Sequence, residues 1–425
     1  MSPEFPRMTS LRQKYARSAP PDIPAAVRQG FESQNILARI KPGARIAVAA
    51  GSRGITHIKE IVAAVIDTLK SAGAQPFIVP AMGSHGGATP EGQAGVLAEY
   101  GITEAHMKAP IQAAMDVERI GTTEDGVDVY FSAEALRADG IVVVNRIKPH
   151  TDFSGAIGSG ILKMLVIGLG KRMGAATFHA AAIRLGYERT IRSIARLSLK
   201  SAPILCGVAS IENQLHETAK IAVLRPEEIE QREEELFAES KHLMPKLPFD
   251  DIDLLIVDRI GKNISGAGMD PNIIGRRVQG FSSSQAEKAP MGANIRRIFA
   301  RELTPETNGN AIGIGFADFT TSRLVRAIDY RSTAVNALTA LTPQSAKVPI
   351  FFDTDREAIQ QALLSLALPD IRQAKVIRIA DTLSLGELEV SEAYQDQIKK
   401  RADLEAVNGA GEMKFDVSEN LLPIA

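Results

Sequence analysis

The sequence predicts an α/β protein with two domains, each built on a largely parallel sheet that helices flank. Short apolar runs of strand length alternate with longer segments whose apolar residues recur at helical spacing, and this βαβα order is typical of parallel sheets. The alternation begins near residue 45 and resumes at Asp253, after a charged stretch. The chain has 425 residues, which is enough for two domains.

The first elements follow from their apolar spacing and from the residues that end them. We expect a strand over 44–50, a helix over 56–72 that stops at Gly73, and a strand over 76–80. Thr89-Pro90-Glu91 then predicts a helix start, with threonine as the N-cap, proline at the first position and glutamate in the first turn.

The next elements lead to the predicted domain boundary. Strands are expected over 140–145, 203–210 and 220–224, and the charged segment 225–239 is expected to be a solvated helix that connects the domains. We therefore predict an N-terminal domain over 8–235 and a C-terminal domain over 236–425, and exclude the first seven residues as a vector-derived extension. The second domain's predicted strands are 254–258, 295–301, 311–316 and 375–380, and its predicted helices are 320–328, 333–341 and 355–367.

Composition excludes several classes of function. The formal net charge of −1 does not favour nucleic acid or an anionic membrane as a partner. No apolar run approaches the roughly 20 residues that cross a bilayer, and no signal peptide is visible, so we expect a cytoplasmic protein. The single cysteine, Cys206, cannot form an internal disulfide or a paired-cysteine metal site, and we expect it to be buried in a strand.

Three polar side chains lie in loops that leave predicted strands. His85 stands between glycines, His150 follows a proline, and Arg53 lies in Gly51-Ser52-Arg53-Gly54. Parallel α/β sheets bind ligands at the carboxyl ends of their strands, so we expect all three in one crevice. Imidazole titrates near neutral pH and binds metals, which favours proton transfer or metal chemistry. Arg53 could clamp a carboxylate or phosphate, or bond only to nearby carbonyl groups.

A glycine-rich loop precedes a lysine in the apolar segment Ile161-Leu162-Lys163-Met164-Leu165. Helix N-termini attract phosphate, but the lysine comes three residues after the last glycine, so this is not a Walker motif. Lys163 is either a surface residue with a buried stem or a desolvated amine suited to covalent chemistry. His179, further along the helical stretch, is a functional group or a core histidine.

At this point the pattern resembles the nickel-dependent lactate racemases and their 2-hydroxyacid racemase homologues. In that family a Gly-Thr/Ser-His loop supplies one catalytic histidine, and a His followed by Gly-Phe-Ser-Gly-Gly and a lysine supplies the second histidine and a covalent anchor. A third histidine downstream binds nickel. The matching residues here are Gly83-Ser84-His85, then His150, Phe153-Ser154-Gly155 and Lys163, and finally His179.

The resemblance implies a cofactor, the nickel pincer nucleotide, which is pyridinium-3,5-bisthiocarboxylic acid mononucleotide with nickel. It would be joined to Lys163 as a thioamide, with His179 as a nickel ligand. The nucleotide would lie on the glycine loop, whose cofactor-binding residues would be Ser154, Gly155, Gly158 and Gly160. The enzymes that make the cofactor, including a nickel insertase, would be partners of the chain.

The resemblance also implies a reaction, the racemisation or epimerisation of a small 2-hydroxy acid. Hydride would pass from C2 of the substrate to the cofactor and return on either face, while a histidine removes the hydroxyl proton. His85 and His150 would be the two acid–base groups, and Arg53 would hold the substrate carboxylate. Lys262 would be a second substrate contact, from the other domain, so the active site would lie in the crevice between the domains.

One departure from the family pattern limits what the resemblance implies. The interval from His150 to Lys163 is about three residues longer than usual, because 156–162 replaces a compact Gly-Gly. This marks a divergent subfamily and leaves the substrate open. The alternatives are a non-racemase of the same fold, which binds a small anion or runs another hydride transfer, and a binding protein that has lost the chemistry.

Overall fold

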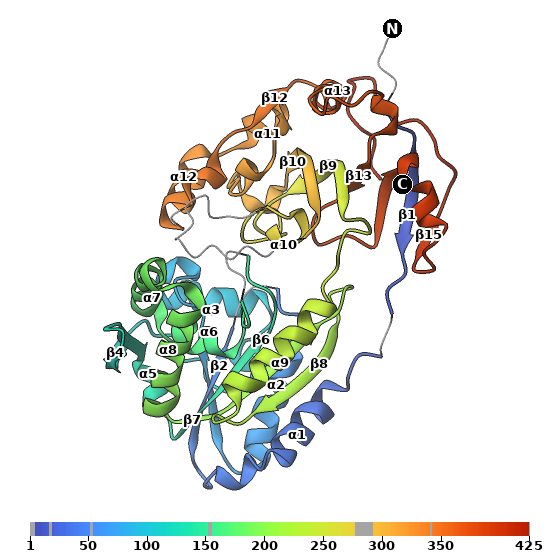
Figure 1. Cartoon of the computed structure of the whole chain (residues 1–425). Helices are drawn as coiled ribbons and strands as arrows, with labels where there is room; N and C mark the ends of the chain where they lie inside the picture. The colour runs from blue at the N-terminus through green and yellow to red at the C-terminus, as the bar shows by residue number, and fades with distance from the viewer. Residues whose placement is uncertain are drawn as a thin grey trace. The chain divides into compact units, whose positions relative to one another are not determined.

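A computed structural model describes residues 5–16, 19–51, 54–151, 155–276, 292–340 and 342–424. They form two compact units: residues 19–244, and residues 5–16 together with those from 245 onward (Figure 1). The predicted α/β class is confirmed. The division differs from the predicted boundary after 235, because helix α9 (Ile229–His242) packs Leu236 and Phe237 into the core of the first unit instead of connecting the domains.

The first unit is built on a five-stranded sheet. Its strands lie in the order β3 (Gln75–Pro80), β2 (Arg45–Ala50), β6 (Gly140–Arg146), β7 (Ile204–Glu212) and β8 (Thr218–Leu224). The first four strands are parallel, and β8 runs antiparallel to β7. All five were predicted, because each is a short apolar run that a turn ends. Cys206 is fully buried in β7, as predicted.

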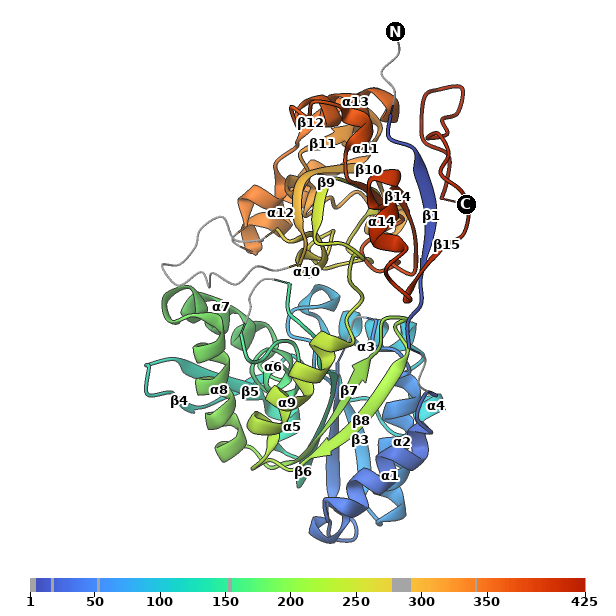
Figure 2. The ribbon, with the colours of Figure 1, turned by 45° about the vertical axis from the view of Figure 1, so that its right-hand side comes forward.

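Both faces of this sheet are covered, as alternate residues of β2 show. Ile46 and Val48 face one core, whereas Ala47 and Ala49 face the other. Figure 2 shows α1 and α2 on one side and α8 and α9 on the other. On the first face lie α1 (Ile23–Ser33), α2 (Ile58–Ser71), α3 (Pro90–Glu99) and α4 (Glu104–Met107). On the second lie the hairpin β4–β5 (Val117–Thr122, Asp128–Ser132), α5 (Ala133–Leu136), α6 (Ile161–Lys163), a π-helix (Met164–Gly168), α7 (Lys171–Leu185), α8 (Tyr187–Ser201) and α9.

Helix α3 begins as its sequence predicts. The Thr89 hydroxyl accepts a hydrogen bond from Gly92 N at 3.1 Å, and Pro90 occupies the first helical position, where its missing N–H has no cost. This start matters for the site, because Thr89 ends the loop that carries His85 and thereby fixes the loop's far end.

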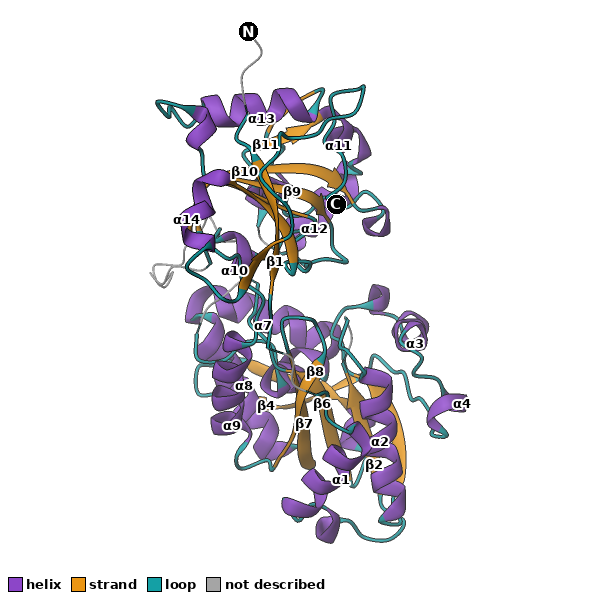
Figure 3. Ribbon diagram, turned by 90° about the vertical axis from the view of Figure 1, so that its right-hand side faces the viewer, coloured by secondary structure: helices purple, strands orange, loops and turns teal. Residues whose placement is uncertain are grey.

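The second unit contains an eight-stranded sheet with a parallel and an antiparallel part (Figure 3). Its order is β12 (Ile350–Phe352), β11 (Phe319–Thr321), β10 (Asn294–Leu303), β9 (Asp251–Ile260), β13 (Val376–Ile379), β14 (Glu387–Ser391), β1 (Met8–Gln13) and β15 (Leu404–Ala406). Its helices are α10 (Pro271–Ile274), α11 (Ser322–Ala327), α12 (Tyr330–Thr339), α13 (Asp355–Leu364) and α14 (Gln395–Ile398). None of the described helices is long and apolar enough to cross a membrane.

The strand predicted over 311–316 is wrong. Residues Ile314–Phe316 form a 3₁₀ turn, and the strand is β11, which begins at Phe319. Gly313 explains the difference, because its φ of +93° is not a strand conformation. A Cβ at Gly313 would lie 1.8 Å from Ala267 O, so glycine is needed there for close packing.

The N-terminal strand belongs to the second unit and not to the first, where the prediction had placed it. In Figure 1, β1 (blue) lies beside β15 (red), and it pairs antiparallel with both β14 and β15. The residues before it, which were predicted to be a vector-derived extension, also pack here. The Phe5 ring lies 5.6 Å from that of Phe415, and Arg7 O accepts a hydrogen bond from Glu392 N at 2.9 Å.

Candidate functional site

Three loops leave the same edge of the five-stranded sheet. β2 lies between β3 and β6, and the three strands are parallel, so their carboxyl ends meet. The loop with His85 follows β3, the loop with His150 follows β6, and Gly51 follows β2. Two strand spacings separate β3 from β6 by roughly 10 Å. The predicted residues Arg53 and Ser154 lie outside the described residues.

The His85 loop is a compact turn that depends on glycine. Gly83, Gly86 and Gly87 have φ values of 63°, 62° and 66°, a region that disfavours residues with a side chain. The Gln93 side chain closes the turn, because its Nε2 donates to Gly83 O at 2.9 Å and to His85 O at 3.4 Å. The backbone on both sides of the half-buried imidazole is therefore fixed.

This loop packs against the segment that follows Lys163. Gly83 N donates to Gly168 O at 3.3 Å, and a Cβ at Gly83 would lie 3.0 Å from the side chain of Ile167. Gly168 ends the π-helix that begins directly after Lys163. Such π-helical turns inside longer helices occur frequently at functional sites. The structure thus brings the His85 loop and the Lys163 segment together.

Lys163 and His179 lie close enough to influence each other. Lys163 is half-buried, and its Nζ donates to Ser159 Oγ at 3.4 Å. Desolvation by its surroundings and the charge of Lys163 lower the pKa of His179. The His179 residue is nevertheless exposed on α7, which excludes the core-packing alternative. A neutral imidazole that reaches solvent is the form that binds a metal.

Tyr187 joins His150 and His179 into one aromatic cluster. Its ring centroid lies 6.2 Å from that of His150 and 6.4 Å from that of His179, and Phe178 packs edge-on against it at 5.4 Å. Sequence reasoning missed Tyr187. The only local signal is Gly186, whose φ of +86° lets α8 start directly after α7 and turns the tyrosine toward the histidines.

The glycine loop between His150 and Lys163 is held by carboxylates. Lys148 and Ser159 exchange two backbone hydrogen bonds of 2.9 Å, which close the base of the loop. Glu188 Oε2 accepts from Ala156 N at 3.0 Å, and Glu233 Oε2 accepts from Leu162 N at 2.9 Å. Two of the amides at the loop and at the start of α6 therefore already have carboxyl groups as partners.

Packing accounts for the three described glycines of this loop. A Cβ would lie 2.1 Å from Glu188 Oε2 at Gly155, 2.5 Å from Lys148 O at Gly158 and 2.3 Å from Glu233 Oε1 at Gly160. Glycine is thus required by the close approach of α8, α9 and the loop's own base. The role of these glycines toward a nucleotide stays a prediction.

Glu233 is fully buried beneath the start of α6. Desolvation raises the pKa of its carboxyl to about 7, although hydrogen bonds from the backbone at Leu162 and Ile161 oppose this shift. Its Oε1 has no hydrogen-bond partner among the described residues. The segment 225–239 was predicted to be a solvated helix, and Glu233 shows that one of its charged side chains is instead part of the core.

Lys262, the predicted substrate contact of the second domain, lies in the second unit. It follows β9, at the carboxyl edge of that unit's parallel strands, and its Nζ donates to Asn336 Oδ1 at 2.6 Å. The described parts of the chain contain no group of three His, Cys, Asp or Glu side chains arranged to hold a metal ion.

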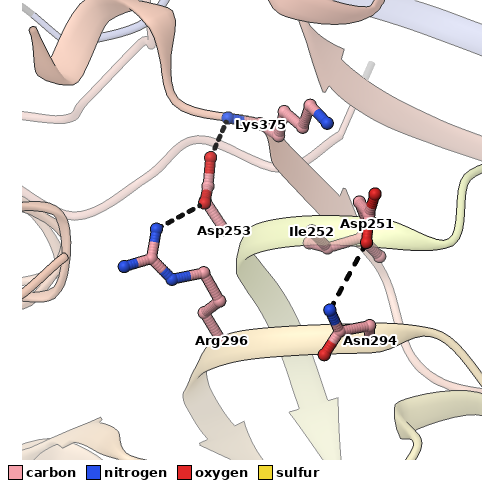
Figure 4. Close-up of a pocket in the computed structure, with 6 residues that line it drawn as sticks. All are labelled: Asp251, Ile252, Asp253, Asn294, Arg296 and Lys375. Carbon is pink, nitrogen blue, oxygen red and sulfur yellow. Dashed lines mark hydrogen bonds and ion pairs between the residues drawn. The ribbon is translucent and has the colours of Figure 1, made fainter. Parts of the chain in front are cut away.

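A surface pocket of about 200 Å³ lies in the second unit, at the opposite ends of the parallel strands (Figure 4). Both of its carboxylates already have partners, because Asp253 accepts from Arg296 at 3.0 Å and from Lys375 N at 2.9 Å, and Asp251 accepts from Asn294 at 3.4 Å. Ligands of parallel sheets bind at the carboxyl ends, and this pocket lies at the amino ends of β9, β10 and β13. We therefore do not assign the site to it.

Comparison with known proteins points to the family that the residue pattern resembles. The family model of the lactate racemase N-terminal domain matches residues 9–190, which include His85, His150, Lys163 and His179. The fold is similar to that of the lactate racemase apoprotein from Thermoanaerobacterium thermosaccharolyticum, with a TM-score of 0.51 and 14% identity over 88% of this chain and 99% of that chain. A protein from Thermotoga maritima matches with a TM-score of 0.49 and 14% identity, over 78% of this chain and 83% of that chain. No curated protein matches the chain.

Proposed function

We propose that the chain is a member of the lactate racemase family and an isomerase that racemises or epimerises a small 2-hydroxy acid; the match of residues 9–190 to the lactate racemase N-terminal domain supports this proposal. The observation that carries the proposal is the placement of two histidine loops, after β3 and after β6, on either side of β2. A small substrate above β2 would have one imidazole on each side. The hydroxyl groups of the two enantiomers point in different directions, so a group that can take the hydroxyl proton is needed on each side of the substrate.

The residues beside these loops fit the nickel pincer nucleotide. Lys163 would hold it covalently, and His179, whose pKa is lowered, would offer a neutral imidazole to the nickel. When bound, the group would supply a reversible hydride acceptor for C2 of the substrate. Ala156 N and Leu162 N are already bonded to carboxylates, so a nucleotide phosphate at the glycine loop would use other donors.

The chain's own side chains would carry out proton transfer and orientation. One of His85 and His150 would take the substrate's hydroxyl proton, and the other would serve the opposite enantiomer. Arg53 would hold the carboxylate, so that only the groups on C2 exchange places, and Lys262 would be a further contact. We also propose a cytoplasmic location and the cofactor-synthesis enzymes, including a nickel insertase, as partners.

The carboxylates on the glycine loop favour one alternative. Because Glu188 and Glu233 occupy amides that a phosphate could use, the same edge could instead bind a small anion without the nucleotide, or serve another hydride transfer. A chain of this kind would bind 2-hydroxy acids without changing their optical purity.

The decisive experiment is mass spectrometry, on the intact protein and on its peptides, of the chain made together with the cofactor-synthesis enzymes. We expect an added mass on the peptide that contains Lys163, none on the Lys163→Arg variant, and loss of optical purity in at least one of a panel of 2-hydroxy acids. The chain made without those enzymes is the control and should be unmodified and inactive. An unmodified Lys163 in the co-expressed chain contradicts the proposal.

A further inference from the structure

Lys171, the first residue of α7, is a charged side chain in an unusual place. It is fully buried, and its φ of +53° lies in the left-handed region that residues other than glycine rarely adopt. Its Nζ donates to Pro80 O at 2.6 Å and to Gln93 Oε1 at 3.2 Å, and both acceptors are neutral. Burial without an opposite charge lowers the pKa of the amine to about 8. Burying a cation in this way is unfavourable, so the position needs an explanation.

The two acceptors connect Lys171 to the His85 loop. Pro80 is the last residue of β3, from which the loop departs. Gln93 is fully buried, and the other end of its amide holds the carbonyl groups of Gly83 and His85. Lys171 thus reaches both the start of the loop and the group that closes it.

The chemistry of the amide makes this link directional. A glutamine side chain has one oxygen, which accepts, and one nitrogen, which donates. The protonated amine of Lys171 has only donor protons, so it fixes the oxygen of Gln93 on its own side and leaves the nitrogen toward the two loop carbonyls. The two loop carbonyls favour the same orientation, and Lys171 adds to this preference by anchoring the oxygen end. Without Lys171 that end of the amide has lost this donor, and the position of the side chain depends on the loop carbonyls alone.

We propose that Lys171 is a positioning residue that sets the place of His85 by fixing the orientation of the Gln93 amide. This inference rests on the proposed function, in which His85 is an acid–base group, and it assigns a role that neither the family match nor the residue pattern contains. A displacement of about 1 Å in a catalytic group can lower a rate by about 10²-fold, so holding the backbone of His85 has a direct effect on turnover.

Two substitutions test the link from its two ends. Lys171→Met keeps the length of the side chain and removes the donor. Gln93→Glu keeps an acceptor for Lys171 but loses the nitrogen that bonds to Gly83 O and His85 O, so it breaks the link while retaining a partner for the amine. Lys200→Met, an exposed lysine at the end of α8, is the matched control.

The first measurement needs neither cofactor nor activity. Diethyl pyrocarbonate modifies accessible imidazoles, and peptide mass spectrometry gives the rate at each histidine of the apo chain. We expect the rate at His85 to rise about threefold or more in Lys171→Met and in Gln93→Glu, with the exposed His106 unchanged as the internal reference. Lys200→Met should match the unsubstituted chain.

The second measurement uses the cofactor-loaded chain. Both substitutions should lower kcat by about 10- to 100-fold and leave KM within about twofold, because the substrate contacts remain. If Lys171→Met does not fold, Gln93→Glu decides. Unchanged modification of His85 and unchanged kcat in Gln93→Glu overturn the proposal. An unsubstituted loaded chain without activity overturns the proposed function instead, and the modification rates still decide whether Lys171 positions His85.

Discussion

The His85 loop and the loop from His150 to Lys163 leave the same sheet edge but are held by different side chains, an amide supported by a base in the first and two acids in the second. The first is held by the Gln93 amide, which a buried ammonium group orients. The second is held by carboxylates of α8 and α9, which bond to Ala156 N and Leu162 N. We call Gln93 with Lys171 the basic clamp, and Glu188 with Glu233 the acidic clamp. Each contains one fully buried ionisable group, Lys171 in the first and Glu233 in the second.

Burial disfavours the charged form of both Lys171 and Glu233, but the two groups change the stability of the fold in opposite directions as the pH rises. Burial lowers the pKa of Lys171 to about 8 and raises that of Glu233 to about 7. Folding therefore becomes less favourable as Glu233 ionises between its unfolded and folded pKa values, and more favourable as Lys171 loses its proton above pH 8. The predictions below test whether the two loops differ in this way.

The largest expected effect is the loss of racemisation rate when the histidine of either loop is replaced. His85→Ala and His150→Ala should each lower kcat for racemisation by about 10²- to 10⁴-fold, because each removes one acid–base group. The exposed His106→Ala is the control and should keep the full rate. Steady-state kinetics with each enantiomer and thermal unfolding of each variant test this. A rate within twofold of the unsubstituted chain, for either loop histidine, would exclude that histidine from proton transfer.

The next effect in size concerns the acidic clamp. The folded pKa of Glu233, about 7, lies above its ordinary value of 4.5, so its contribution to stability is fully present below about pH 4.5 and is lost as the pH rises through 7. The loss is on the order of 3 kcal/mol. Glu233→Gln cannot ionise and should remove this part of the pH dependence.

Urea unfolding at intervals between pH 5 and pH 8 measures that difference. Relative to the unsubstituted chain, Glu233→Gln should gain stability as the pH rises from 5 to about 7 and should gain little more by pH 8, and the two should converge toward pH 5. Lys220→Gln, which loses a charge from a pair on the surface of the same unit, should give a nearly constant difference. A difference between Glu233→Gln and the unsubstituted chain that does not change with pH would show that Glu233 is ionised throughout.

Much of the first sheet could be predicted because its strands are apolar runs that glycine or polar turns end. The same rule failed at 311–316, where Gly313 takes a conformation that no strand adopts. It also missed β1, which is stabilised by pairing with β14 and β15 from the far end of the chain. Pairing between distant segments leaves no local pattern.

The residues of the candidate site also divide into those that local sequence could predict and those that it could not. His85 and His150 could be found from the strands that they follow, and the structure brings Lys163 near His179. Tyr187, Lys171 and Glu233 could not be found, since each acts through neighbours that only folding supplies. Glu233 lies in a run of charged residues whose local pattern predicts solvent exposure, and its burial is decided by the packing of α9 under α6.

A smaller effect on stability tests how tightly the His85 loop packs against α3, the helix that follows it. A Cβ at Gly92 would lie 1.8 Å from Gly86 O, so Gly92→Ala must displace the loop backbone and should destabilise the fold by about 2 kcal/mol. Gly95, in the same helix, has no atom within 4 Å of a Cβ, and Gly95→Ala should stabilise the fold by about 0.5–1 kcal/mol. Urea unfolding of both variants measures the contrast, and equal values would contradict the close contact.

The smallest expected effect lies at the exposed end of the acidic clamp. Glu188 accepts from Ala156 N at 3.0 Å and pairs with Arg192 at 2.6 Å, but its side chain is 28% exposed. Glu188→Gln keeps an acceptor for Ala156 N and loses only the ion pair, while Arg192 retains Glu230 and Glu234. The expected loss of stability is therefore about 0.5 kcal/mol.

Glu188→Ala removes the acceptor as well, and the difference between the two variants isolates the hydrogen bond that holds the glycine loop. That bond should be worth about 1 kcal/mol, less than the ionisation of Glu233, because water can replace a partner at a half-exposed position. Unfolding in urea at pH 7, with both variants and the unsubstituted chain, gives the three values. If Glu188→Ala and Glu188→Gln are equally stable, the glycine loop is held by Glu233 and its own backbone bonds, and the acidic clamp reduces to one buried carboxyl group.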